Sequence, residues 1–332
     1  MNKPKLIYRF RALEDHLLER ELDALSKSYL YAPTFQQMND PMEAFYETGG
    51  GADPLLNATL FIPNGQNIKN FYEILHNTID KFALISFSDT YKNLPMWAYY
   101  ASNFTGMCLE FDPCELTIGD LQNEELCPVA YAENALPSLT IADLGPDNLP
   151  SLIKPRLTRK RIEWAHEREW RYLTGADGKK HYVDDALRRV LLGPRVKPEH
   201  AKRICDALGN RPVEVLRGVI RGYDFSFQSI KPASSLQRSE RVGAGNFSRH
   251  DALFEESKLE LFLNVSIESL IQECERIKLR PNLDEICYIN IATAEEDSII
   301  IQTTFKLRGG HNTYYKNFYY DRNLKLLSIG NQ

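Results

Sequence analysis

The chain has 332 residues, of which 43% are hydrophobic and 26% are charged, and its formal net charge is −5. These values are typical of a globular protein of about two domains, and the net negative charge excludes a global basic field for nucleic acid. No apolar run approaches the roughly 20 residues that span a bilayer, and the N-terminus leads into a short strand rather than a signal peptide. We therefore expect a cytoplasmic protein without a membrane partner.

Strands and helices of uneven length alternate through the first two thirds of the chain. Apolar patterns predict strands at 6–10, 29–32, 82–88, 106–112, 129–131, 190–194 and 213–220, and helices at 14–27, 68–80, 93–102 and 198–208. Glycine and proline at 47–67 predict a loop. The strand at 213–220 is expected to be the last of this region. The order predicts an α+β fold with a mixed or antiparallel sheet and interleaved helices.

A shift in composition at 234–246, which is rich in Ser, Gly and Arg, predicts a linker. It divides a motif-bearing α+β domain at 1–233 from a small C-terminal unit at 247–332. The small unit is expected to hold a helix and an antiparallel meander, at 266–278, 286–292, 298–307, 311–320 and 324–329, with a turn at Gly309-Gly310. We expect an accessory unit that meets a protein partner.

The six cysteines are scattered, with no CxxC pair and no spacing typical of Cys and His ligands. This pattern argues against a structural zinc site or a disulfide framework and favours reduced thiols. The sequence therefore predicts no metal site.

The segment Glu167–Tyr172 holds the densest group of chemically useful side chains. Read as a strand, it places Glu167, Glu169 and Arg171 on one face. Such a face suits a cleft in which acids bind hydroxyls or a developing positive charge, and it equally suits a solvent-facing strand or helix with ion pairs. A basic run precedes it at 156–161. Such runs are usually solvated, and phosphate or RNA contact is the functional alternative.

Several short motifs, in chain order, resemble those of a bacterial family of domains of unknown function. The family's motifs are YRxR, FNDPxE, MWxxYA and EKEWR, and this chain matches them at residues 8–11, 35–43, 96–101 and 167–171, with Ser86-Phe87-Ser88 and 106–111 between. Met38 replaces the usual Phe of the second motif. The resemblance covers about residues 5–222 and implies no activity.

The same order is also similar to the Arg–Ser–Glu class of mono-ADP-ribosyltransferases. By that resemblance, Arg9 would steady the phosphates of NAD, and Ser86 or Ser88 would support its nicotinamide end. Glu169, with Glu167 as the first acid of the pair, would stabilise an oxocarbenium-like transition state. Trp97 or Tyr99 would stack on a base. The resemblance implies NAD as a substrate, transfer to a protein or nucleic acid target, and a role as a toxin or in phage defence. Ser-Phe-Ser stands where that class has Ser-Thr-Ser.

Other readings of these residues remain open. Arg9 also fits a buried ion pair with Glu43 or Glu110, and serines and aromatic residues also fit ordinary strand and core positions. A non-enzymatic module that binds a nucleotide or a partner is the first alternative function. The second is a metal-dependent nuclease that uses Glu43, Glu167 and Glu169, although these carboxylates lack a recognisable metal spacing.

Overall fold

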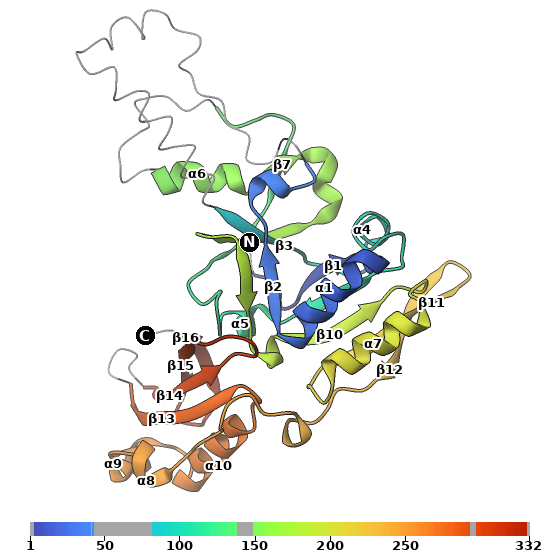
Figure 1. Ribbon diagram of the computed structural model, residues 1–332. Coiled ribbons are helices and arrows are strands. Elements are labelled where there is room, and N and C mark those ends of the chain that lie inside the picture. The colour runs from blue at the N-terminus through green and yellow to red at the C-terminus, as the bar shows by residue number, and fades with distance from the viewer. Residues whose placement is uncertain (1–2, 41, 43–81, 138–148, 293–296, 331–332) are drawn as a thin grey trace, which may run out of the picture. The chain divides into compact units, whose positions relative to one another are not determined.

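The computed structural model describes residues 3–40, 42, 82–137, 149–292 and 297–330 (Figure 1). The chain forms two compact units whose segments interleave along the sequence. The first unit comprises residues 1–3, 31–93 and 124–179, and the second comprises residues 4–30, 94–123 and 180–332. The predicted loop at 47–67 and helix at 68–80 lie outside the described residues.

A large mixed sheet of eight strands supplies elements to both units. The strands of the second unit are, in sheet order, β12 (Asp224–Lys231), β11 (Glu214–Arg221), β10 (Leu187–Leu192), β4 (Met107–Phe111) and β1 (Ile7–Arg11). Those of the first unit are β3 (Ala83–Ser88), β8 (Glu169–Thr174) and β5 (Leu126–Pro128). Because β10 pairs parallel with β11 but antiparallel with β4, the predicted α+β fold with a mixed sheet is confirmed.

In the first unit, β8 lies between β3 and β5 and pairs antiparallel with both. The other elements are η1 (Phe35–Gln37), β6 (Ala130–Ala132), α6 (Leu149–Leu157), β7 (Arg159–Arg161) and η4 (Ile162–Glu167). Helix α6 buries Ile153 and Leu157 in a cluster with Phe35 and Leu84, while β7 pairs parallel with β6. Packing of α6 and pairing of β7 together fix the position of the basic run at 156–161.

The second unit packs two amphipathic helices, α1 (Asp15–Ser26) and α7 (Pro198–Leu208), against each other (Figure 1). Their apolar faces are buried, with Leu18 and Leu25 on α1 and Ile204 on α7. The short helices α4, α5 and η5 span Leu94–Tyr99, Pro113–Leu116 and Asp184–Ala186. The pair β2 (Tyr29–Ala32) and β9 (Gly178–His181) forms a separate small sheet.

Strand β12 corrects the expectation that 213–220 is the last strand of its region. It forms a hairpin with β11 across the turn Gly222-Tyr223, where Gly222 has a φ of +61° that favours glycine. Phe225 and Phe227 on β12 lie 5.6 and 5.9 Å from the ring of Trp97. In the sequence these two phenylalanines alternate with polar residues, and such alternation is typical of a half-buried strand.

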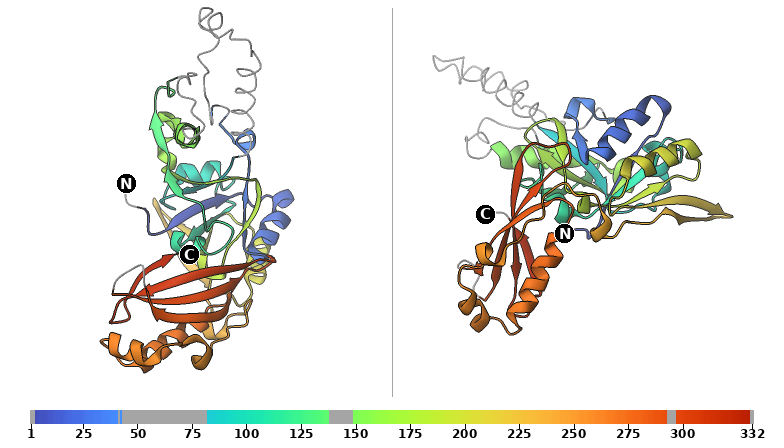
Figure 2. Two further views of the ribbon diagram at one scale, coloured as in Figure 1. Left: turned by 90° about the vertical axis from the view of Figure 1, so that its left-hand side faces the viewer. Right: turned by 60° about the horizontal axis from the view of Figure 1, so that its bottom comes forward.

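The C-terminal part of the second unit contains the predicted helix and meander. It comprises α8 (Arg249–Ala252), α9 (Glu256–Phe262), α10 (Ile267–Lys278) and a four-stranded antiparallel sheet of β13 (Leu283–Ile291), β14 (Ile299–Lys306), β15 (Thr313–Tyr320) and β16 (Leu326–Gly330) (Figure 2). The expected turn is present, with Gly309 at a φ of +75°. The domain boundary at 234–246 stays a prediction.

Candidate functional site

The predicted acid pair lies at the junction of η4 and β8 in the first unit. Glu167 ends the 3₁₀ helix η4, and Arg168, at a φ of +50°, turns the chain into β8, which begins at Glu169. The prediction that Glu167 lies on the strand is therefore wrong. Both carboxylates nevertheless bind the same ammonium group. The Nζ of Lys160 on β7 lies 2.6 Å from the Oε2 of Glu167 and 3.0 Å from the Oε2 of Glu169.

Arg171 engages the other side of Glu169. Its Nε and Nη2 donate to the two carboxylate oxygens of Glu169 at 2.8 and 2.9 Å, and its Nη1 donates to the carbonyl of Leu157 at 2.7 Å. This fork geometry is the one in which arginine binds a carboxylate most strongly. Arg171 is fully buried, so the interaction is shielded from solvent and salt.

The four side chains form a buried cluster of two carboxylates and two cations, Glu167, Glu169, Lys160 and Arg171. Burial raises the pKa of Glu169, but the charges of Arg171 and then Lys160 outweigh it and lower the pKa to about 2. Glu169 therefore remains ionised at neutral pH. Its two oxygens are bound by Arg171 and Lys160, and as an ionised group it is a poor proton donor.

Both predicted serines lie next to this cluster, because β3 pairs with β8. Ser88 stands opposite Glu169, and Ser86 stands opposite Arg171. The Ser88 hydroxyl donates to the carbonyl of Glu167 at 2.8 Å, and the Ser86 hydroxyl is buried and has no hydrogen-bond partner among the described residues. The first unit thus brings together four of the predicted site residues.

The other three predicted residues, Arg9, Trp97 and Tyr99, belong to the second unit. Arg9 lies on β1 opposite Leu109, and burial, with a contribution from Arg11, lowers its pKa. Trp97 is a fully buried core residue of α4, surrounded by the rings of Phe10, Phe104, Phe225 and Phe227. The side chain of Tyr99 is 70% exposed.

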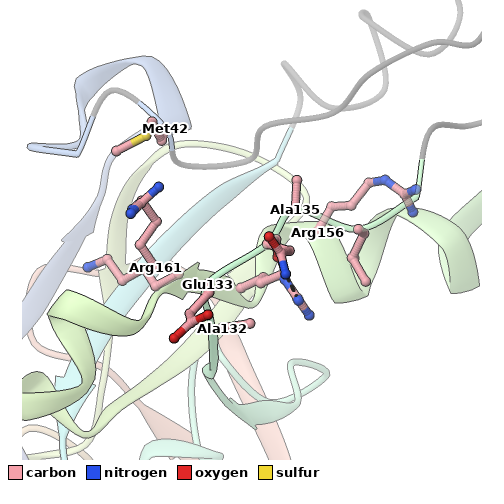
Figure 3. Close-up of a pocket in the computed structure, with 10 residues that line it drawn as sticks. Met42, Ala132, Glu133, Ala135, Arg156 and Arg161 are labelled. Atoms are coloured by element: carbon pink, nitrogen blue, oxygen red, sulfur yellow. Dashed lines mark hydrogen bonds between the residues drawn. The ribbon is translucent and has the colours of Figure 1, made fainter.

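A pocket of about 240 Å³ opens in the first unit over β6, β7 and α6 (Figure 3). Its lining combines four cationic residues with one acid, one amide and apolar side chains: Arg156, Arg159, Lys160, Arg161, Glu133, Asn134, Met42, Ala132, Ala135 and Leu136. Lys160 therefore belongs both to the pocket lining and to the buried cluster. The sequence identified the basic run, but it gave no signal that residues 132–136 form the facing wall.

The cations of the pocket also hold its walls in place. Arg159 donates to the carbonyl of Asn134 through Nε at 3.1 Å and Nη2 at 2.7 Å. Arg156 donates to the carbonyls of Leu152 at 2.7 Å and Pro137 at 2.5 Å. Backbone carbonyls carry no net charge, so these bonds orient the guanidinium groups without neutralising them. Arg161 is paired with Glu163 at the exposed surface.

The nuclease alternative includes Glu43, which lies outside the described residues. In the described part of the chain, no group of three or more His, Cys, Asp or Glu side chains is arranged to hold a metal ion. The other two carboxylates, Glu167 and Glu169, are bridged by an ammonium group.

Comparison with known proteins gives one family match. Residues 96–172 match a family model described as "Protein of unknown function (DUF2971)", which supports the predicted resemblance to a domain of unknown function over that range. The match begins within α4, at Met96, and extends through the acid pair to Tyr172. No curated protein and no solved structure matches the chain. None of the helices in the described ranges is long and apolar enough to cross a membrane.

Proposed function

We propose that the first unit binds a nucleotide through its phosphate in the pocket over β6, β7 and α6. The observation that carries this proposal is a concave site of about 240 Å³ in which Arg156 and Arg159 donate to neutral backbone carbonyls, while the other two cations, Lys160 and Arg161, are paired with carboxylates. Arginine presents a planar fork of donors that matches a phosphate group. The proposal corresponds to the binding-module alternative rather than to an assigned reaction.

The chemistry of the lining favours a nucleotide over inorganic phosphate. Apolar groups from Met42, Ala132 and Leu136 provide a surface on which a base or a sugar can pack, and Glu133 and Asn134 provide acceptors for hydroxyl or amino groups. The volume lies just below the range of about 300–1,000 Å³ that holds drug-sized ligands. One nucleoside monophosphate moiety therefore fits better than a whole dinucleotide, of which part would extend into solvent.

Binding is tested by isothermal titration calorimetry of the full chain with AMP, NAD and inorganic phosphate. We expect AMP and NAD to bind with similar affinity and phosphate to bind more weakly. Arg159→Ala and Arg161→Ala each remove a charged donor and should weaken AMP by about tenfold. Lys154→Ala is the matched control, because Lys154 is an exposed α6 cation that pairs with Glu125 and does not line the pocket.

Two results would refute the proposal. One is the absence of heat and of thermal stabilisation with AMP and NAD. The other is equal weakening of AMP by Arg159→Ala and Lys154→Ala, which would reflect a general loss of positive charge rather than a site.

A second candidate function is the NAD-consuming ADP-ribosyltransferase that the motif order implies, with a protein or nucleic acid as target. The observation that favours it is the pairing of β3 with β8, which places Ser86 and Ser88 close to Glu169. An ionised glutamate is the group that stabilises an oxocarbenium-like transition state. Arg9, Trp97 and Tyr99 belong to the other unit and are not part of this candidate, and Trp97 is fully buried in the core of that unit.

This candidate predicts release of nicotinamide from NAD by the wild-type chain in the presence of cell extract as acceptor. Glu169→Gln should abolish release, because the amide carries no negative charge. Glu169 is buried, so the melting temperature of the variant is measured in parallel. A folded Glu169→Gln variant with unchanged release, or a wild-type chain without release, would reject the transferase and leave the binding proposal standing.

A further inference from the structure

The C-terminal sheet presents one buried face and one accessible face. Alternate residues of β14 and β15, such as Ile301, Phe305 and Phe318, are buried. The intervening residues lie on the opposite face, here called the outer face because it contains accessible tyrosines. It comprises Tyr288, Asn290, Ile300, Gln302, Thr304, Tyr315, Asn317 and Tyr319, of which Thr304 and Asn317 are buried.

The outer face is unusually rich in tyrosine and side-chain amides. Tyr315 is 62% exposed, and Tyr288 and Tyr319 are half-buried. Phe254, which is 68% exposed, adds a fourth ring at the edge and lies 5.5 Å from the ring of Tyr288. Tyr315 and Tyr319 are four residues apart on β15, or about 13 Å at the rise of an antiparallel strand.

The amides fix two of the rings. The Nδ2 of Asn290 donates to the hydroxyl of Tyr288 at 2.7 Å, and the Nδ2 of Asn317 lies 3.5 Å from the hydroxyl of Tyr319. In each case the partners are two residues apart on one strand and on one face, so the ring must lean along its strand. Rings held in this way present their faces rather than their edges to a ligand and lose little entropy on binding.

The charge of this region selects the ligand class. Residues 247–332 contain 13 acidic and 10 basic residues, a net charge of −3. The charged residues next to the outer face include Glu285, Lys306 and Glu255; Lys306 is paired with Asp284, and Glu255 lies beside Asn290 and is paired with Lys258. A phosphodiester chain requires cations that this face lacks. A neutral ligand that has a flat apolar side and many hydroxyl groups does not require cations for binding.

We propose that the outer face of β13, β14 and β15 binds a neutral carbohydrate chain. The tyrosine rings stack against the C–H faces of the sugar rings. The half-buried Gln302 donates to and accepts from sugar hydroxyls, because a side-chain amide carries both functions. The ring spacing on β15 accommodates an oligosaccharide rather than a single sugar. This site is independent of the pocket in the first unit.

The test is affinity electrophoresis of the full chain in gels that contain glycogen, hydroxyethyl cellulose, xylan or mannan, followed by calorimetry with the hexasaccharide of the polysaccharide that retards the protein. We expect at least one polysaccharide to retard the wild type, and Tyr315→Ala and Tyr319→Ala to weaken binding by about tenfold each. Tyr223→Ala is the control, because Tyr223 is a fully exposed tyrosine at the tip of the β11–β12 hairpin, away from this face. It should bind like the wild type.

The proposal is overturned if none of the gels retards the wild type. It is also overturned if Tyr315→Ala and Tyr319→Ala are retarded as strongly as the wild type, because the sugar then binds elsewhere. Binding of poly(dT) that these variants lose, without any binding of polysaccharide, would assign the face to single-stranded nucleic acid instead.

Discussion

Glu169, a candidate catalytic residue, also takes part in a buried network of ion pairs. Its carboxylate receives two bonds from Arg171 and one from Lys160, all within a buried cluster. Two carboxylates and two cations balance each other, so the cluster avoids the large cost of an isolated buried charge. Lys160 also lines the pocket, and the cluster therefore holds one of the proposed ligand contacts in place.

Replacing Arg171 should lower the free energy of unfolding far more than replacing Arg168. Arg171→Met leaves Glu169 buried without its fork partner and should lower the free energy of unfolding by about 3–5 kcal/mol. Arg168→Met breaks only an exposed pair with Asp89 and should lower it by about 0–1 kcal/mol. Urea denaturation of both variants measures the difference, and equal effects would contradict a structural role for the cluster.

The two variants should also differ in how their stability depends on pH below about 4.5. The pKa of Glu169 is lowered from 4.5 to about 2 in the folded protein, so its stabilising contribution is complete above pH 4.5 and is lost as the pH falls towards 2. Arg171→Met should raise that pKa and flatten the pH dependence of stability in this window. Arg168→Met should leave the dependence as it is in the wild type.

At the scale of elements, sequence periodicity located most strands and helices in the described ranges. It succeeded for β3, β4 and the C-terminal meander because their apolar residues alternate or run continuously. It missed β12, although Phe225 and Phe227 alternate there with polar residues; both rings are half-buried against Trp97 of α4. It also extended β8 back to Glu167, since the left-handed turn at Arg168 has no signature in a residue type that rarely adopts it.

The site was only partly predictable for a related reason. Motif order pointed to Ser86, Ser88, Glu167 and Glu169, and the pairing of β3 with β8 brings them together. Lys160, which joins the acids, was read as part of a solvated basic run. The facing wall at 132–136 is made by a parallel pairing of β6 with β7, and such a long-range contact between two strands of three residues cannot be recovered from local patterns.

At the scale of the whole chain, Asp184 joins distant segments of the second unit. Its fully buried carboxylate accepts from Ser28 at 2.8 Å and from Arg308 at 2.9 Å, and its backbone N–H donates to Asn282 at 2.7 Å. Arg211 lies 3.3 Å away. These bonds connect the strands of the C-terminal meander to the first helix region of the same unit.

Asp184→Asn should therefore weaken the second unit as a whole. Removing the charge leaves Arg211 and Arg308 without their common buried partner, and the free energy of unfolding should fall by about 3–5 kcal/mol. Asp224→Asn, at an exposed position of the β11–β12 hairpin, should change it by less than about 0.5 kcal/mol. Urea denaturation followed by circular dichroism provides the measurement, and a shift of similar size in both variants would disprove the connecting role of Asp184.

The interleaving of the two units has a consequence for synthesis on the ribosome. Every segment of the first unit has been translated once residue 179 is complete, whereas the second unit waits for strands that end at residue 330. Segments 4–30 and 94–123 of the second unit can pair with each other through β1 and β4, but their other partners in that unit are translated only after residue 179. The nascent protein thus exposes the apolar faces of α1 and α4 until their partners α7 and β12 are complete at residues 208 and 231, which takes up to about forty seconds at about 5–20 residues per second. During that interval these helices are natural clients for a chaperone.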